Sequence, residues 1–196
     1  MIIEVFYHGS AKINLSMIKP NKSTHGKNYI YATKYRIIAL LFLARWNDFL
    51  LTLQTEIVDN KLKITLTERY ENAIYELFNG KSGVIYTLKS DNFKQEKNLW
   101  EYEYISDQEE KPISSEMINN ILDEIKILNQ KGDLDIYYYP NRPLNIPIDD
   151  SDMIDKCIEL YRLSGNISNA TFCIERFPKL RKQIVQVFKE QFDLEL

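Results

Sequence analysis

Glycine, cysteine and histidine are all scarce in this chain, and each scarcity excludes a class of site. Its 196 residues include six glycines, two cysteines and two histidines. Neither a Gly-x-Gly-x-x-Gly nor a Walker A pattern occurs, which excludes a glycine-rich phosphate loop. Cys157 and Cys173 are too few for a disulfide framework or a metal cage, so we expect buried thiols on helices. His8 and His25 are far apart in sequence, and we expect no zinc or other metal site.

Strong charge of one sign and long hydrophobic runs are also missing. The formal net charge is −3, which argues against a large nucleic-acid-binding face. The longest apolar run, Ile37–Ala44, is too short to cross a bilayer. The first residues, Met-Ile-Ile-Glu, lack the basic and long apolar regions of a signal peptide. We therefore expect a cytoplasmic protein with no membrane partner and no nucleic-acid partner.

The chain instead contains many short apolar segments and 13 tyrosines, a residue that favours strands and the edges of clefts. Leu62, Ile64 and Leu66 alternate with polar residues, as in a half-buried strand. Strands are expected at 2–7, 28–32, 49–58, 61–67, 83–88, 100–106 and 135–139. Helices are expected at 34–46 (with Thr33 as the N-cap), 70–79, 115–128, 149–163 and 169–192. This order predicts an α+β fold rather than regular βαβ alternation.

A change in composition divides the chain near its last third. Residues 141–147 hold Pro143 and Pro147 and read as a linker. We predict one domain over residues 1–140 and a C-terminal helical segment over 141–196, packed on that domain.

Candidate functional residues lie at the predicted strand ends. The apolar run Val5-Phe6-Tyr7 ends in His8-Gly9-Ser10, where glycine admits a ligand close to the backbone. Tyr31 and Glu103 lie on two later predicted strands, 28–32 and 100–106. We expect these polar groups to converge on one cleft.

These residues resemble the motifs of the ADP-ribosyltransferases of the diphtheria-toxin and poly(ADP-ribose) polymerase class, which are defined by a His-Tyr-Glu triad. Tyr7-His8-Gly9-Ser10 is similar to the first motif, Ile30-Tyr31-Ala32-Thr33 to the second, and Glu103-Tyr104-Ile105 to the third. The resemblance covers roughly residues 3–110. It implies a split β-sandwich with an NAD cleft between two sheets, with NAD as a substrate and no metal.

The resemblance also implies a role for each residue. His8 would hold a hydroxyl of the adenosine ribose, and Gly9, in the motif with Ser10, would hold the nicotinamide amide. Tyr31 and Phe42 would sandwich the nicotinamide ring, since aromatic faces suit a flat cation. Glu103 would stabilise the positive ribosyl centre. Ala39 stands where polymerases of the class carry a hydroxyl, a departure that the toxin-like members tolerate.

Glu101 is a candidate on the acceptor side of the reaction. Glu101-x-Glu103 resembles the pattern of arginine-modifying transferases, and a strand over 100–106 would place both carboxylates on one face. That group begins with an arginine where this chain has His8, so arginine is not assigned as the acceptor. The acceptor, a protein or another molecule, stays unidentified.

Other functions and purely structural roles remain open. The same residues suit an NAD glycohydrolase, or an inactive module that binds NAD or ADP-ribose. An RNA 2′-phosphotransferase shares the fold, but no basic cluster lies near His8. Phe42 also suits a helix core, and Glu101 also suits plain surface charge.

Overall fold

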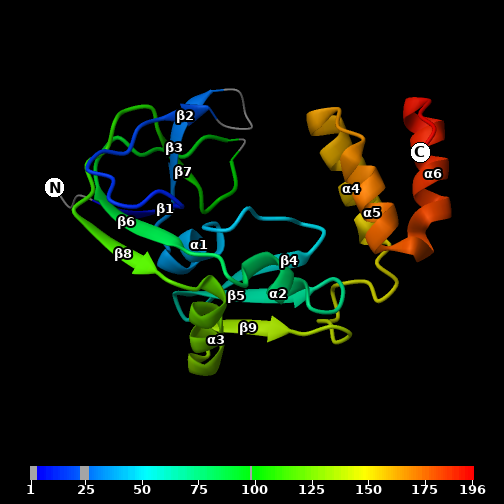
Figure 1. The fold of residues 1–196 in the computed structure, drawn as a ribbon, viewed down its shortest axis with the longest axis horizontal. Coiled ribbons are helices and arrows are strands. Elements are labelled where there is room, and N and C mark those ends of the chain that lie inside the picture. Colours follow the sequence, from blue (N-terminus) through cyan, green and yellow to red (C-terminus); the bar gives the residue numbers. More distant parts are fainter. Residues whose placement is uncertain (1–3, 23–26, 98) are drawn as a thin grey trace. The chain divides into compact units, whose positions relative to one another are not determined.

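The chain folds into short strands and helices of a mixed α+β type, seen in a computed structural model that describes residues 4–22, 27–97 and 99–196 (Figure 1). The strands of this part are β1 Val5–Ser10, β2 Asn21–Lys22, β3 Asn28–Ala32, β4 Leu51–Val58, β5 Lys61–Glu68, β6 Gly83–Lys89, β7 Tyr104–Ser106, β8 Ser114–Ile118 and β9 Leu134–Tyr137. The helices are α1 Arg36–Leu41, α2 Ala73–Phe78, α3 Ile121–Lys131, α4 Asp152–Ser164, α5 Ser168–Arg176, the 3-10 turn η1 Pro178–Leu180 and α6 Arg181–Phe192. His25 and the first two residues of the predicted strand 2–7 lie outside the described residues.

The strands form three small sheets. Their orders are β1-β6-β8, β2-β3-β7 and β4-β5-β9. Strand β6 pairs antiparallel with both β1 and β8 and is buried over most of its length. One bridge joins the first two sheets: the Tyr7 N–H donates to the Thr33 carbonyl at 2.7 Å, and the Thr33 N–H returns a bond at 3.0 Å.

The chain forms two compact units, each with its own apolar core. The first comprises residues 1–46, 57–63 and 74–134, and the second 47–56, 64–73 and 135–196. The second unit thus includes the expected C-terminal helical segment and also earlier parts of the chain. Its core joins Phe49 to the inner faces of α4, α5 and α6, where Cys157 and Cys173 are buried free thiols, as predicted.

The core of the first unit lies under β1, β3 and β6. Phe6, Ile30, Tyr86 and Leu88 are each at most 1% exposed. The Tyr86 hydroxyl donates to the Lys12 carbonyl at 2.9 Å and accepts the Leu15 N–H at 3.0 Å. A buried tyrosine is thereby satisfied, and the segment after β1 is fixed.

The predicted helix 115–128 is wrong at its start. Residues 114–118 form β8 along the free edge of β6, with Met117 opposite Val84. Helix α3 begins only after Asn120, whose side-chain oxygen accepts the Leu122 N–H at 3.2 Å. It ends at Gly132, which takes the left-handed φ of 77° typical of a C-cap. The serines of β8 are poor helix formers, whereas Asn120 is a strong N-cap.

The predicted helix 169–192 is also wrong, because it is two helices. Pro178 has no N–H and disfavours the helical conformation in the residue before it. Phe177 accordingly takes φ −122° and ψ 67°. Helix α5 ends there, and η1 leads into α6.

Helix α1 is shorter than the predicted 34–46. Its N-cap is Tyr35, not Thr33, and no side chain caps it. The Thr33 hydroxyl instead accepts the Tyr35 N–H at 3.2 Å, in a turn before the helix. The helix ends at Phe42, which is its C-cap.

Candidate functional site

His8 lies on β1 at the point where β1 and β3 are bridged. Its Nδ1 is 2.7 Å from the carbonyl oxygen of Tyr31. A carbonyl only accepts, so Nδ1 carries the hydrogen, and the other ring nitrogen, Nε2, is an acceptor in the neutral ring. Burial lowers the pKa of His8 from 6.5, against a smaller opposing effect of the Tyr31 bond. The half-buried ring is therefore neutral at pH 7.

Gly9 is required by the packing of β1 against α1. A Cβ at this position would lie 2.6 Å from the carbonyl oxygen of Ala39 and 3.1 Å from Cδ2 of Leu43. Any side chain would therefore push the strand and the helix apart. Gly9 and Ala39 both line a cavity beside β1, as the resemblance led us to expect for Gly9.

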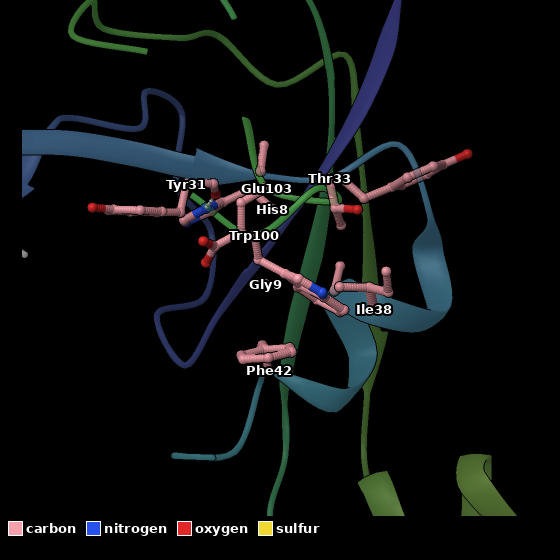
Figure 2. A pocket seen from close by; sticks show the side chains of 11 residues that line it. His8, Gly9, Tyr31, Thr33, Ile38, Phe42, Trp100 and Glu103 are labelled. Carbon is pink, nitrogen blue, oxygen red and sulfur yellow. Dashed lines mark hydrogen bonds between the residues drawn. The ribbon is translucent and has the colours of Figure 1, made fainter. Parts of the chain in front are cut away.

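Glu103 is brought to His8 and Tyr31 by the pairing of β7 with β3. Tyr104 lies opposite Ala32 and Ile105 opposite Tyr31, so Glu103 precedes the paired segment. All three candidate side chains line this same cavity, which has a volume of about 350 Å³ (Figure 2). Their expected convergence on one cleft is confirmed. Two of them come from strands and the third from a turn.

The predicted strand 100–106 is wrong over its first four residues. Residues 101 and 102 form a turn, and the Glu103 N–H donates to the Trp100 carbonyl at 2.9 Å. The Trp100 and Tyr102 rings pack edge-to-face across this turn, with centroids 5.0 Å apart. Glu101 and Glu103 therefore do not share a strand face. Glu101 is exposed and is not among the residues that line the cavity.

Ser10 also lies outside the cavity lining. Its hydroxyl accepts the Lys12 N–H at 3.1 Å, which ties the turn after β1. In place of a ligand contact, Ser10 thus has a local structural role.

An aromatic wall closes one side of the cavity. Phe42, at the end of α1, is 42% exposed. Its ring centroid lies 5.5 Å from that of Trp46, nearly stacked, and 6.0 Å from that of Trp100. Phe42 and Trp100 line the cavity together with Ile38 (Figure 2). Trp100 is a lining residue that the sequence reasoning missed. Its signal was an aromatic residue three positions before the candidate glutamate.

The arrangement offers a neutral histidine acceptor, a carboxylate and exposed aromatic faces around a cavity open to a small molecule. Within the described part of the chain, no group of three or more His, Cys, Asp or Glu side chains is arranged to hold a metal ion. In the same part, no helix has the length and apolar character needed to cross a membrane.

Comparisons with known proteins add no relative: no protein-family model, no curated protein and no solved structure matches the chain.

Proposed function

We propose that this cavity binds NAD and that the chain transfers ADP-ribose from NAD to an acceptor, most simply one unit at a time. The observation that supports this best is the meeting of His8, Tyr31 and Glu103, from three separate segments, in one cavity. In this proposal the sheets β1-β6-β8 and β2-β3-β7 are the halves of a split β-sandwich. The cavity lies beside the Tyr7–Thr33 bridge that joins them.

The aromatic wall suits the nicotinamide ring. In NAD this ring is flat and cationic, and aromatic faces attract such cations. Phe42 and Trp100 expose ring surface to the cavity from one side, and Tyr31 lines it as well. At about 350 Å³ the cavity is at the small end for drug-sized ligands. In the proposal it therefore takes the nicotinamide riboside half of NAD, with the adenosine ribose reaching His8 and the adenine extending over the surface.

His8 suits a ribose hydroxyl. Its Nδ1–H is fixed by the Tyr31 carbonyl, which leaves Nε2 as the acceptor. Burial keeps the ring neutral by lowering its pKa. A hydroxyl of NAD would donate to Nε2, as it could not to a protonated ring.

Glu103 suits the reaction centre. In the reaction, the bond between C1′ of the ribose and the nicotinamide nitrogen breaks, and its electron pair leaves with nicotinamide. The ribosyl centre becomes positive until the acceptor attacks C1′ and loses a proton. A carboxylate fixed beside C1′ stabilises this developing charge, which is the kind of effect that dominates such catalysis.

The position of Glu101 favours NAD hydrolysis as the second candidate. The carboxylate expected to orient an acceptor is exposed and outside the cavity lining. Water as the acceptor needs no carboxylate to orient it. His8, Tyr31 and Glu103 would act in hydrolysis as they would in transfer.

Incubation with NAD labelled in its adenosine part tests the proposal. The assay measures nicotinamide release and label on protein or other acceptors in a cell lysate. Release with labelling supports transfer, and release alone replaces transfer by hydrolysis. Bound NAD without release, detected by calorimetry, would indicate an inactive binding module. Absence of both binding and release would overturn the proposal.

A further inference from the structure

Glu110 is a buried acidic residue that takes no part in the proposed contacts to NAD. It is 5% exposed and is not among the residues that line the cavity beside β1. A buried acidic group is costly unless hydrogen bonds replace the water that it has lost. The partners of Glu110 therefore show which parts of the chain it holds.

Three donors meet at a single oxygen of Glu110. Its Oε1 accepts from the Ser90 hydroxyl at 3.0 Å, from the Asn92 side-chain amide at 3.0 Å and from the Ser106 hydroxyl at 3.1 Å. The backbone of Glu110 is also held, because its N–H and carbonyl exchange hydrogen bonds with Ile18 at 2.9 and 2.8 Å. Ile18 belongs to the core of the first unit. The side chain of Glu110 thus fixes its three donors relative to that core.

The donors come from both of the sheets that carry the candidate site. Ser90 follows β6, which pairs along the whole of β1, the strand of His8. Ser106 is the last residue of β7, and Glu103 directly precedes that strand. One oxygen of Glu110 therefore links the sheet of His8 to the segment that carries Glu103.

Asn92 adds a connection along the second edge of β7. The strand pairs with β3 along one edge. Along the other, Lys94 exchanges backbone hydrogen bonds with Ile105 at 3.0 and 2.9 Å. Phe93, between Asn92 and Lys94, has its ring centroid 4.7 Å from that of Phe6 on β1. Strand β7 has three residues, so these contacts outside the strand restrain the residue that precedes it.

We propose that Glu110 is a positioning residue of the cavity, which sets the place of the Glu103 carboxylate relative to His8 without touching the ligand. This role rests on the proposed function, in which both residues contact NAD. The geometry of a reacting site tolerates little movement, and a displacement of about 1 Å can lower a rate about 10²-fold. The hydrogen bonds of Glu110 oppose such a displacement at the end of β7 and at the end of β6.

Amide hydrogen exchange of the full chain without NAD tests the structural half of this role. In Glu110→Ala the amides of Lys94 and Ile105, which join their two segments, should exchange about tenfold faster than in the wild type. The amide of Glu124 in α3, bonded to the Asn120 carbonyl, is the internal control and should not change. Unchanged exchange at Lys94 and Ile105 would overturn the role of Glu110, whatever the wild type does with NAD. Equally faster exchange at all three amides would indicate general destabilisation and would overturn it as well.

Nicotinamide release by single variants tests the functional half. Glu110→Ala should lower release about 10²-fold. Glu110→Gln should lower it less, because the amide oxygen can accept the same bonds without the charge. Ser106→Ala removes only the bond from β7, so it should also lower release and it serves if Glu110→Ala does not fold. Glu109→Ala removes an exposed carboxylate one residue away, paired with Lys19 at 2.9 Å, and should release nicotinamide at the wild-type rate. Wild-type release in both Glu110→Ala and Ser106→Ala would contradict the positioning role.

A double variant shows whether Glu110 acts through Glu103. If it does, adding Glu110→Ala to Glu103→Gln should lower release by much less than about 10²-fold, because the carboxylate to be positioned is already gone. A full loss in both backgrounds would indicate a purely structural role and would overturn the proposal. A wild type that releases no nicotinamide would overturn ADP-ribose transfer instead, and the exchange measurement would then decide alone whether Glu110 holds the segment of Glu103.

Discussion

Glu103 is the residue whose substitution separates a catalytic carboxylate from one that only lines the cavity. Glu103→Gln keeps the size of the side chain and removes its charge. Under the proposed function we expect an intact fold and nearly unchanged NAD binding, because most of the proposed contacts to NAD involve other residues. Nicotinamide release should fall by about 10²–10³-fold, the scale on which a lost electrostatic group affects turnover. The measurements are single-turnover release and calorimetric binding of NAD.

Glu101→Gln is the control for this change. It removes the same charge two residues away, from an exposed turn outside the cavity lining. Release should stay at the wild-type rate. If both variants lost release equally, the effect would come from the turn as a whole and not from a carboxylate at the reaction centre.

Burial of His8 makes the free energy of unfolding depend on pH. Burial lowers its folded-state pKa below the ordinary 6.5. Below pH 6.5 the unfolded chain therefore binds a proton that the folded chain resists, so the free energy of unfolding falls as pH drops towards the folded-state pKa. Above pH 6.5 the histidine ring is neutral in both the folded and the unfolded chain, and the stability that is lost at lower pH is fully present. Urea unfolding at a series of pH values should show the slope in the wild type and a smaller one in His8→Asn. An identical slope in both would assign the pH dependence to other groups.

Elements with a clear local sequence pattern were predicted correctly. An element that forms only by pairing with another part of the chain was not. Strand β3 was predicted with its observed bounds, and the alternation of Leu62, Ile64 and Leu66 correctly indicated β5. Residues 114–118 could not be identified in the same way, because they become a strand only by pairing with the edge of β6. The break in the last helix could have been found from Pro178 alone.

Asn120 should account for much of the stability of the start of α3. Its side-chain oxygen accepts the Leu122 N–H, and its amide donates to Asp123 at 2.8 Å. Asn120→Ala removes the cap and should cost about 1 kcal/mol in the free energy of unfolding. Asn119→Ala, at the exposed neighbour outside the helix, should cost less. Urea denaturation of the two variants measures the difference, and equal costs would contradict the capping role.

Across the whole molecule, the candidate site was easier to predict than its surroundings. His8, Gly9, Tyr31, Phe42 and Glu103 were all identified from motif order, and all line the cavity. Ser10 and Glu101 do not line it, because sequence neighbours need not share a surface. A strand was assumed around Glu101 where the chain turns. The aromatic wall escaped notice because Phe42 and Trp100 meet only through tertiary packing.

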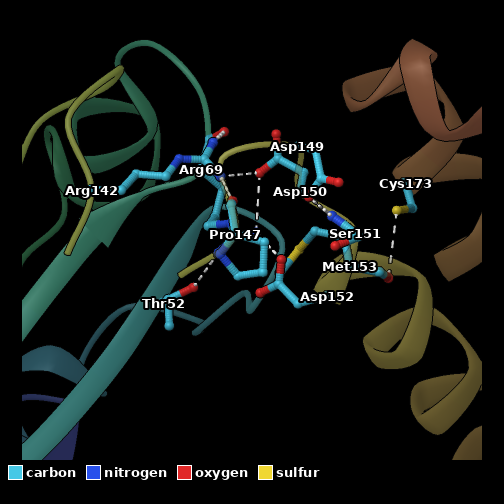
Figure 3. Close-up of polar contacts among 10 residues, drawn as sticks. All are labelled: Thr52, Arg69, Arg142, Pro147, Asp149, Asp150, Ser151, Asp152, Met153 and Cys173. Carbon is cyan, nitrogen blue, oxygen red and sulfur yellow. Dashed lines mark hydrogen bonds and ion pairs between the residues drawn. The ribbon is translucent and has the colours of Figure 1, made fainter. Parts of the chain in front are cut away.

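The second unit is assembled from separate parts of the chain, and an ion network of Arg69, Arg142 and Asp150 joins three of them (Figure 3). Arg69 comes from the segment after β5, and its Nη1 also contacts the Thr52 hydroxyl at 3.3 Å. Arg142 donates to the carbonyl of Arg69 at 3.2 Å and to that of Pro147 at 2.7 Å. Asp150 accepts hydrogen bonds from both arginines and so connects Arg69 to Arg142.

Asp150→Asn should therefore destabilise this unit strongly. The backbone at residue 150 has a φ of 60°, a left-handed conformation that asparagine tolerates as well as aspartate does. The substitution thus removes the charge without introducing backbone strain. Arg142 loses its carboxylate partner, and Arg69 keeps its contacts to Asp152 and to the Thr52 hydroxyl. Removing one partner from a buried ion pair typically costs about 3–5 kcal/mol, because the remaining charge stays buried. Asp149→Asn, at the exposed neighbour, should leave the urea midpoint close to that of the wild type. A near-neutral Asp150→Asn would mean that water reaches and solvates the two arginines, and that the network contributes little to holding these segments together.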